Sequence, residues 1–503
     1  MATSIIKLAH NATTAKLIDA SREAKLEVHR VLSYQVAGVE HMAAFKTGNW
    51  DGRASFFDFT SGTFPRGFVT LVSQALIKAG FKTQLVRKPF PSPLGPEAPV
   101  VDAFPTDPRY EYQERVMESL LKHGQIIAQV ATGGGKSRIA KLVIARIARP
   151  TLFLTTRGIL MYQMASSLES LGKRVAILGD GNLEVSKEVT CGMVQTIMSW
   201  LKDLDEKADE SAKLKQRKRQ EAMIKTLERF EMVILEEAHE ASGNSYYDIL
   251  RHCKNAHYRM ALTATPFMKD SEEANMRLMA SSGPIAIKVS EQLLIDRGIL
   301  AKPYFKFVTL ADKPKDLYRS TSWQRAIEVG IRDNALRNKH IVAESIRAVR
   351  HGMSIMVLVQ NKKHGAILQE RMTTAGLRAT YIFGEDSQVE RQAALTALKT
   401  HQIDVLIGST ILDVGVDVPA VGMVILAGGG KAEVALRQRI GRGLREKKDG
   451  SPNVALIVDF ADDFNTHLKG HYRQRRSIIE GTPGFSENIV TDFDYAGLGL
   501  RRV

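Results

Sequence analysis

The stretch IIAQVATGGGKS, residues 126–137, places an apolar run directly before three glycines, a lysine and a serine. The apolar run predicts a buried strand, and the residues from Lys136 onward have a helical pattern. Glycine at positions 133–135 lets the backbone curl and turn its N–H groups towards phosphate oxygens, and the helix N-terminus adds positive potential. A glycine turn beside a chance lysine is the alternative, but the order of strand, loop and helix favours a nucleotide-binding loop.

The alternation of short apolar runs with longer helical patterns extends well beyond this loop. Helical patterns occupy residues 136–148 and 158–171. Strands are predicted at 126–132, 151–156, 174–179, 232–237, 259–265, 354–360, 378–384, 404–410 and 421–429. Such alternation is typical of parallel sheets that are covered by helices on both faces. The sequence therefore predicts an α/β fold with two consecutive parallel-sheet domains that meet near residue 298.

Composition points to a globular protein with a polyanionic partner. The chain has 503 residues, 44% of them hydrophobic, and a formal net charge of +15. A charge of this size favours nucleic acid as the partner. The plainer alternative is that the excess positive charge only keeps the protein soluble. Residues 202–231 carry nine Lys/Arg and eight Asp/Glu and lack proline and glycine, so an exposed helical insertion is expected there in preference to a DNA-touching arm.

The other compositional signals concern redox state, location and assembly. Cys191 and Cys253 lie outside any CxxC pair, so we expect two buried, reduced thiols and no zinc site. No apolar stretch is long enough for a signal peptide or a membrane span. We therefore expect a cytoplasmic protein, in a phage or bacterial cytosol, that acts as a monomer and has no membrane partner.

A proline-rich segment gives the clearest domain boundary. Residues 88–108 hold seven of the chain's 16 prolines, which excludes a regular helix or a central strand and predicts a semi-rigid linker. The module before it has 11 Lys/Arg against six Asp/Glu. The predicted divisions are an N-terminal accessory domain at 1–87, the linker at 88–108, α/β domains at 109–297 and 298–480, and a tail at 481–503.

Further motifs lie on both sides of the phosphate loop along the chain. YEYQERVMESLL (110–121) precedes the loop, and TTRGILMYQ (155–163), EEAH (236–239), TATP (263–266), GSTILDVGVDVP (408–419) and QRIGRGLR (438–445) come after it. This set resembles the motifs of superfamily 2 helicases over about residues 109–460. The tyrosine–glutamine pair and the short C-terminal region resemble the branch that contains XPB and UvsW. Residues 45–69 resemble the N-terminal domain of phage recombination helicases of the UvsW type.

The resemblance implies two tandem RecA-like domains, preceded by a small N-terminal α+β domain, that bind ATP between them and use their closure as a mechanical stroke. It assigns adenine recognition to Gln113. The nucleotide would also contact Thr132, Gly133, Gly134, Gly135, Lys136, Ser137, His239, Gly415 and Asp417. Ser137 and Glu236 would hold Mg²⁺. Glu237, Arg442, Arg445 and Gln438 would be catalytic, with Glu237 orienting water and the arginines stabilising transferred charge.

The same resemblance implies a nucleic-acid track and a function. Thr156, Arg157, Gln195, Thr196 and Thr410 would grip the backbone of one strand, so binding should be largely independent of sequence. Thr263 and Thr265 either couple the ATP site to this track or are plain turn residues before Pro266. Trp50 and Arg53, in the glycine-rich GNWDGR, would contact DNA, although Trp50 is equally suited to a core. The expected substrate is branched or duplex DNA, with RNA or an RNA–DNA hybrid also open.

Two positions depart from the motif pattern. Val130 stands where a strict phosphate loop has glycine, and Glu236 stands where the common residue is aspartate. A carboxylate survives at 236, so the metal keeps an oxygen ligand and we favour a working site. Three hypotheses follow: an ATP-dependent DNA helicase acting in recombination, repair or replication, a duplex DNA translocase that does not separate strands, and a non-hydrolysing nucleic-acid-binding scaffold.

Overall fold

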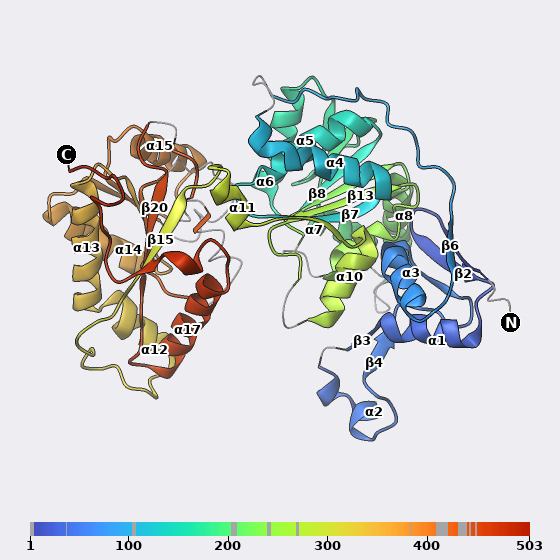
Figure 1. The fold of residues 1–503 in the computed structure, drawn as a ribbon, viewed down its shortest axis with the longest axis horizontal. Helices are drawn as coiled ribbons and strands as arrows, with labels where there is room; N and C mark the ends of the chain where they lie inside the picture. The colour runs from blue at the N-terminus through green and yellow to red at the C-terminus, as the bar shows by residue number, and fades with distance from the viewer. Residues whose placement is uncertain are drawn as a thin grey trace. The chain divides into compact units, whose positions relative to one another are not determined.

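The structure is a computed structural model that describes residues 5–36, 38–102, 107–202, 209–238, 243–267, 271–383, 385–408, 421–430, 440–441, 444–447 and 450–502. Within these residues the chain forms two compact units that divide close to residue 288. The first unit contains the N-terminal domain and one parallel-sheet domain, and the second contains the other parallel-sheet domain (Figure 1).

The N-terminal residues form a small α+β domain. Its sheet has the strand order β5-β2-β1-β6, in which β1 pairs antiparallel with β2 and parallel with β6. The elements are β1 (Ile6–His10), β2 (Thr14–Ile18), α1 (Arg22–Val31), β5 (Thr63–Pro65), η2 (Arg66–Phe68), α3 (Val69–Lys78) and β6 (Thr83–Val86). Helix α1 begins after Ser21, whose hydroxyl accepts a hydrogen bond from the Ala24 amide.

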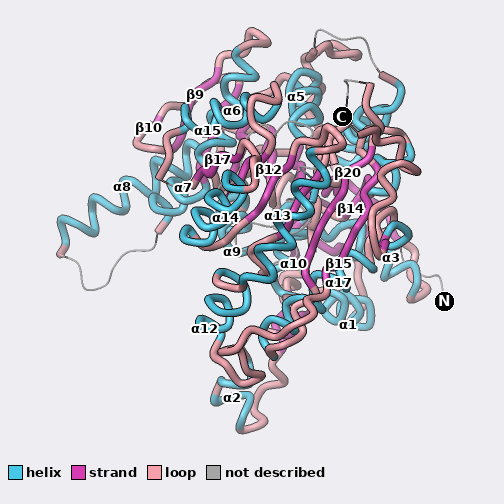
Figure 2. The backbone as a smooth tube through the Cα atoms, turned by 90° about the vertical axis from the view of Figure 1, so that its left-hand side faces the viewer, coloured by secondary structure: helices cyan, strands magenta, loops and turns pink. Residues whose placement is uncertain are grey.

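A hairpin arm extends from this domain. Strands β3 (Ser33–Gln35) and β4 (Arg53–Ser55) pair antiparallel at its base, and η1 (Val39–His41) and α2 (Ala43–Lys46) lie between them. Figures 1 and 2 both show α2 projecting away from the rest of the unit. The arm also carries the exposed apolar side chains of Met42 and Phe45.

Buried contacts join the N-terminal domain to the first parallel-sheet domain. The buried Arg66 donates to the carbonyl oxygens of His257 (2.9 Å) and His123 (3.2 Å), and the Gln125 amide donates to the Ala12 carbonyl (2.8 Å). Ala280 of the sheet domain belongs to the N-terminal domain's own apolar core. The domain predicted at residues 1–87 therefore shares a core with the domain that follows it.

The proline-rich segment lies against the first parallel-sheet domain as a strap. The amides of Leu94 and Gly95 donate to the carbonyls of Ile147 and Arg146, and Val101 is buried. A Cβ on Gly95 would lie 1.8 Å from the Ala145 carbonyl oxygen, so only glycine permits this approach. Residues 88–102 form no helix or strand, as the prolines predict, and they are anchored along the helix that follows the phosphate loop.

The first parallel-sheet domain has the strand order β10-β9-β11-β8-β12-β13-β7-β14. Strands β9, β11, β8, β12, β13 and β7 run parallel, and helices lie on both faces (Figure 1). The strands are β7 (Gln125–Val130), β8 (Thr151–Thr155), β9 (Val175–Gly179), β10 (Asn182–Leu183), β11 (Val189–Met193), β12 (Met232–Glu236), β13 (Tyr258–Thr263) and β14 (Ile285–Val289). The helices are η3 (Pro108–Tyr110), α4 (Glu111–His123), α5 (Lys136–Ile147), α6 (Gly158–Glu169), α7 (Val194–Leu201), α8 (Glu210–Leu227), α9 (Gly243–Leu250) and α10 (Glu272–Ser282).

The predicted helical insertion at 202–231 is confirmed where the structure describes it. Helix α8 buries Met223 and Leu227 in the domain core and exposes most of its charged residues. Figure 2 shows its N-terminal end projecting from the domain.

The second unit contains a parallel sheet of order β17-β18-β16-β19-β20-β15-β21. Its strands are β15 (Lys302–Val308), β16 (Ile355–Leu358), β17 (Ala379–Ile382), β18 (Val405–Gly408), β19 (Met423–Leu426), β20 (Val454–Phe460) and β21 (Ile489–Val490). Its helices are α11 (Glu291–Asp296), α12 (Trp323–Ile327), η4 (Glu328–Arg332), α13 (Ala335–Val349), α14 (Lys362–Thr374), α15 (Gln388–Lys399), α17 (Thr466–Glu480) and η6 (Ser486–Asn488).

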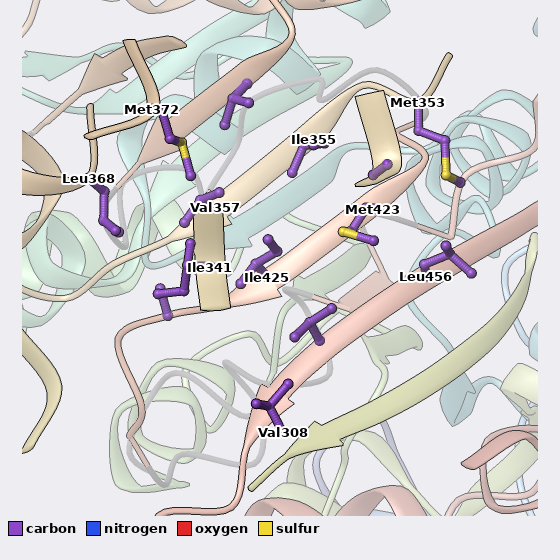
Figure 3. Close-up of a cluster of buried hydrophobic side chains, with 14 of the residues drawn as sticks. Val308, Ile341, Met353, Ile355, Val357, Leu368, Met372, Met423, Ile425 and Leu456 are labelled. Atoms are coloured by element: carbon purple, nitrogen blue, oxygen red, sulfur yellow. The ribbon is translucent and has the colours of Figure 1, made fainter. Parts of the chain in front are cut away.

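The main core of this unit lies between the sheet and helices α13 and α14. Figure 3 shows Ile355, Val357 and Ile425 from the strands facing Ile341 and Leu368 from the helices. Residues 481–503, which the sequence separates as a tail, contribute Phe493 and Tyr495 to the same core and add β21 beside β15.

Two smaller expectations concern thiols and membranes. Cys191 and Cys253 are buried free thiols, as predicted, and burial raises the pKa of each to about 12. Among the helices that the structure describes, none is long and apolar enough to cross a bilayer.

Candidate functional site

The phosphate loop adopts a curled backbone between β7 and α5. Gly133 and Gly135 have φ angles of 87° and 78°, a region that residues with a Cβ rarely enter. Gly135 is the residue that precedes α5, so the loop leads into a helix N-terminus at Lys136. The curled loop and the N-terminus of α5 together direct backbone N–H groups and the positive end of the helix dipole towards the same place, which suits a bound phosphate.

Sheet topology brings the EEAH acids to this loop. Strands β12, β13 and β7 are parallel neighbours, so their carboxyl ends lie at one edge of the sheet. The Lys136 ammonium lies 3.4 Å from a carboxylate oxygen of Glu237, and both side chains are mostly buried. Glu237 itself has φ of 46°, a strained left-handed conformation that turns the chain directly after β12.

Glu236 is the last residue of β12 and is 6% exposed. Its backbone carbonyl accepts a hydrogen bond of 3.1 Å from the Tyr246 hydroxyl, which helps to hold the end of the strand in place. Ser137 is exposed in the first turn of α5. Carboxylate and hydroxyl oxygens are ligands that Mg²⁺ takes, so both side chains have suitable chemistry, and their role in holding magnesium stays a prediction.

Gln113 lies beside the phosphate loop. Its side chain is fully buried at the start of α4, and its carbonyl oxygen accepts a 2.5 Å hydrogen bond from the Arg138 guanidinium. A Cβ on Gly135 would lie 2.4 Å from the Gln113 amide nitrogen. Arg138 in turn pairs with Asp102 of the strap at 2.5 Å.

The described residues of the predicted nucleic-acid track gather at the ends of β8 and β11. The Gln195 amide donates to the Thr156 carbonyl at 3.0 Å, and the Arg157 amide donates to the Thr155 hydroxyl at 3.3 Å. Thr196 follows Gln195 in the first turn of α7 and is partly exposed. Their contact with nucleic acid stays a prediction.

The TATP motif forms a compact turn after β13. Thr263 is buried, and its hydroxyl accepts a hydrogen bond of 3.2 Å from the Thr265 amide. Gln129 of β7 donates to the Ala264 carbonyl at 3.3 Å. The motif is therefore tied to the strand that leads into the phosphate loop.

Trp50 and Arg53 are engaged within the hairpin arm. The Trp50 indole donates to the Arg53 carbonyl at 2.8 Å, and the Arg53 guanidinium donates to the Ser33 carbonyl at 2.8 Å. Arg53 also lies 3.8 Å from the Glu272 carboxylate of α10. Both residues thus hold the arm together, and their proposed contact with DNA stays a prediction.

Several predicted site residues lie outside the described residues. These are His239, Thr410, Gly415, Asp417, Gln438 and Arg442. Arg445 is described and forms an isolated β-bridge with Leu300. The roles of all seven residues stay predictions.

Sequence reasoning missed three residues around the site. Arg138 donates hydrogen bonds to both Asp102 and Gln113, and the Tyr246 hydroxyl donates to the Glu236 carbonyl. Arg138 directly follows the GKS of the loop, which is a weak positional signal. Asp102 lies 36 residues away from Arg138, and the sequence carries no pattern that would pair them.

Two protein families match the regions that build these motifs. Residues 107–268 match the family described as "Type III restriction enzyme, res subunit", and residues 337–447 match the "Helicase conserved C-terminal domain". The first match covers the phosphate loop, EEAH and TATP. The second covers GSTILDVGVDVP and QRIGRGLR.

The chain belongs to the superfamily 2 helicases. It is an ATP-hydrolysing enzyme of this superfamily, with two RecA-like domains. The predicted fold class is therefore confirmed. Of the three hypotheses, the non-hydrolysing scaffold is the one that this assignment does not support.

Individual relatives of this superfamily 2 helicase agree with the assignment. The ATP-dependent DNA helicase uvsW of Enterobacteria phage T4 is 23% identical over 490 residues, which are 92% of this chain and 91% of that protein. The DNA 3'-5' translocase XPB2 of Sulfurisphaera tokodaii is 23% identical over 70% of this chain and 82% of its own. A type I restriction enzyme fragment from Vibrio vulnificus YJ016 shares the fold, with a TM-score of 0.51 and 20% identity over 70% of this chain and 63% of that one.

Proposed function

We propose that this superfamily 2 helicase uses ATP to unwind or remodel branched DNA in recombination, repair or replication. Three observations support the proposal. The relative from phage T4 that aligns over nearly the whole chain is named an ATP-dependent DNA helicase. The chain has a net charge of +15, which suits a polyanion. A small domain with a projecting arm precedes the RecA-like domains and could engage a junction (Figure 1).

The main support for ATP hydrolysis at this site is the contact between Lys136 and Glu237. The two groups lie 3.4 Å apart at the carboxyl edge of the sheet, beside a loop built for phosphate. Lys136 would bind the β- and γ-phosphates, and Glu237 would orient the attacking water. Glu236 and Ser137 would hold Mg²⁺, whose positive charge offsets charge on the phosphates.

The remaining roles follow from the helicase motifs. Arg442 and Arg445 would stabilise charge on the transferred phosphoryl group, which can be worth roughly 10³–10⁵ in rate. Gln438 would sense the γ-phosphate or position water, and His239 would link that phosphate to the TATP turn. Gly415 and Asp417 would contact the ribose and phosphates.

DNA would follow the strand ends that carry Thr156, Arg157, Gln195 and Thr196. These residues offer hydroxyl, guanidinium and amide donors, which suit phosphate oxygens better than particular bases. Binding should therefore be largely independent of sequence and should weaken as salt rises. Because such contacts do not read the sugar strictly, an RNA–DNA hybrid is a further substrate to test.

A strand-displacement assay tests the proposal. We expect the wild-type enzyme with ATP and Mg²⁺ to separate the strands of a labelled fork. Lys136→Ala should release no strand, because it lacks the charge that binds the ATP phosphates. It should bind the fork with unchanged affinity, because Lys136 is not expected to contact DNA. Normal unwinding by Lys136→Ala would contradict the site assignment.

A second candidate function is translocation on duplex DNA without strand separation. The similarity to a protein named a DNA 3'-5' translocase favours it. A translocase would displace the third strand of a triplex from plain duplex while leaving forks intact. Fork unwinding without triplex displacement would favour the helicase.

A further inference from the structure

The buried Gln113 side chain is held by a polar relay. Its carbonyl oxygen accepts from the Arg138 guanidinium at 2.5 Å. A second nitrogen of Arg138 donates to the Asp102 carboxylate at 2.5 Å, and the Lys141 ammonium donates to the other Asp102 oxygen at 3.0 Å. The relay therefore runs from the proline-rich strap, across the first turns of α5, to the residue packed against Gly135 of the phosphate loop.

The chemistry of these groups fixes the orientation of the amide. A guanidinium has only donors, so the Gln113 atom that faces Arg138 must be the carbonyl oxygen. Turning the amide by 180° would place two donors against each other inside a fully buried site. Asp102 holds Arg138 in place, and its two cationic partners keep the pKa of its carboxyl below the ordinary value despite the opposing effect of burial.

The orientation of a glutamine amide matters for base recognition. Adenine offers an N7 acceptor and an N6 donor, and a glutamine can satisfy both with its nitrogen and oxygen. Guanine offers two acceptors, N7 and O6, at the corresponding places. An amide that turns freely can present donor or acceptor to either position, so it discriminates less between the two bases.

We propose that Arg138 and Asp102 are positioning residues that fix the Gln113 amide and thereby set the enzyme's preference for adenine over guanine nucleotides. This inference rests on the proposed nucleotide-binding function and on contact between Gln113 and the base. It adds two residues, one of them from the strap, to the determinants of nucleotide selectivity.

Steady-state hydrolysis of ATP and GTP tests the relay. Arg138→Met keeps an unbranched apolar stem in place of the aliphatic part of arginine but removes the guanidinium donors. We expect the KM for ATP to rise about tenfold with kcat within about twofold, while the KM for GTP changes little, because one buried hydrogen bond is lost. Asp102→Asn should shift selectivity in the same direction by a smaller factor.

A matched control lies on the same helix. Arg146 of α5 also anchors the strap, through a 2.9 Å hydrogen bond to the Gly95 carbonyl. Within the described part of the chain it forms no hydrogen bond or ion pair with Gln113, Arg138 or Asp102. Arg146→Met should leave the ratio of ATP to GTP efficiency unchanged. An equal loss of selectivity in Arg146→Met would assign the effect to strap anchoring and overturn the inference.

A double-mutant cycle separates positioning from general damage. In a Gln113→Ala background, Arg138→Met should have no further effect on selectivity. An effect of full size in that background, or a Gln113→Ala variant with wild-type selectivity, would overturn the inference. These outcomes are distinct from failure of the proposed function, which would appear as undiminished ATP turnover in Lys136→Ala.

Discussion

At the scale of single residues, the two acids at the end of β12 have separable roles. Glu237 faces Lys136 and is proposed to orient water. Glu237→Gln keeps the shape and removes the charge, so hydrolysis should fall by orders of magnitude while ATP still binds. Equilibrium nucleotide titration beside a phosphate-release assay would check both parts. Loss of binding together with turnover would assign Glu237 to ground-state binding instead.

Glu236 is proposed to hold Mg²⁺ with a side chain one methylene longer than the common aspartate. Glu236→Asp should keep ATPase activity within roughly tenfold, which is about 1.4 kcal/mol of barrier. Glu236→Ala should raise the Mg²⁺ concentration needed for half-maximal turnover and lower the rate, because the metal loses a ligand. A Mg²⁺ titration of both variants tests this, and an unchanged midpoint in Glu236→Ala would exclude the metal role.

His364 gives a prediction about acid stability. It is buried in α14, where its Nε2 lies 2.9 Å from the Asn338 side-chain oxygen. Burial, with the nearby charge of Arg337, lowers its pKa from 6.5 to about 3. Between these values the unfolded chain binds a proton that the folded chain does not, so stability falls as pH falls, by up to about 1.4 kcal/mol per pH unit.

His364→Gln should reduce this loss, because glutamine keeps a donor for Asn338 and does not titrate. Urea unfolding of wild type and variant at pH 7 and pH 5 would measure the difference. Identical acid sensitivity of the two proteins would show that His364 is not the titrating group.

The sequence predicts which side chains meet at the candidate site where those side chains belong to a recognisable motif. Lys136 and Glu237 follow different strands, yet parallel-sheet topology places the carboxyl ends of those strands at one edge, so their meeting could be anticipated. Asp102 could not be anticipated, because its partners depend on how the strap packs along α5. The strained backbone of Glu237 likewise depends on tertiary contacts.

At the scale of elements, the arm is the feature to perturb when testing junction recognition. Deleting residues 1–87 would strip buried contacts such as Arg66 to His257 and Gln125 to Ala12, so it would also damage the RecA-like domain. Gln35 pairs with Arg53 across the arm's base. A two-residue Asn-Gly turn can therefore replace residues 36–52 and close the hairpin.

We expect this arm replacement to leave basal ATPase within about twofold and to lower the preference for forked over single-stranded DNA about tenfold, which is the scale of one lost base-stacking contact. Turnover against DNA concentration, with fork and single strand compared, measures it. Trp50→Phe is the matched point variant, because it keeps an aromatic ring and removes the donor to the Arg53 carbonyl. A full preference for forks in the arm replacement would dismiss the arm as the junction-recognising element.

The elements themselves differ in how far the sequence predicts them. Central strands such as β8 and β16 are nearly continuous apolar runs between helical patterns, so they stand out. Strands β11 and β14 do not, because Thr190 and Gly192 interrupt the first and β14 alternates between partly buried and exposed residues at a sheet edge. Pairing with neighbours, more than intrinsic propensity, makes them strands.

At the scale of the whole molecule, an accessory domain and two RecA-like domains make up an ATP-hydrolysing superfamily 2 helicase. The order of motifs and the alternation of strands and helices anticipated the two parallel sheets. Docking of the N-terminal domain on the first sheet was not foreseen, because it depends on buried polar contacts such as those of Arg66. Likewise, residues 481–503 complete the second core through Phe493 and Tyr495.

The most direct test of the central claim is the rate of ATP hydrolysis measured across single-stranded, duplex, forked and four-way DNA, with matched RNA controls and Lys136→Ala in parallel. We expect DNA to raise wild-type turnover, most strongly with forked and four-way substrates. Lys136→Ala should stay at background on every substrate. A wild-type rate that no nucleic acid increases, or a rate that Lys136→Ala shares, would show that the enzyme is not an ATPase driven from this phosphate loop by DNA.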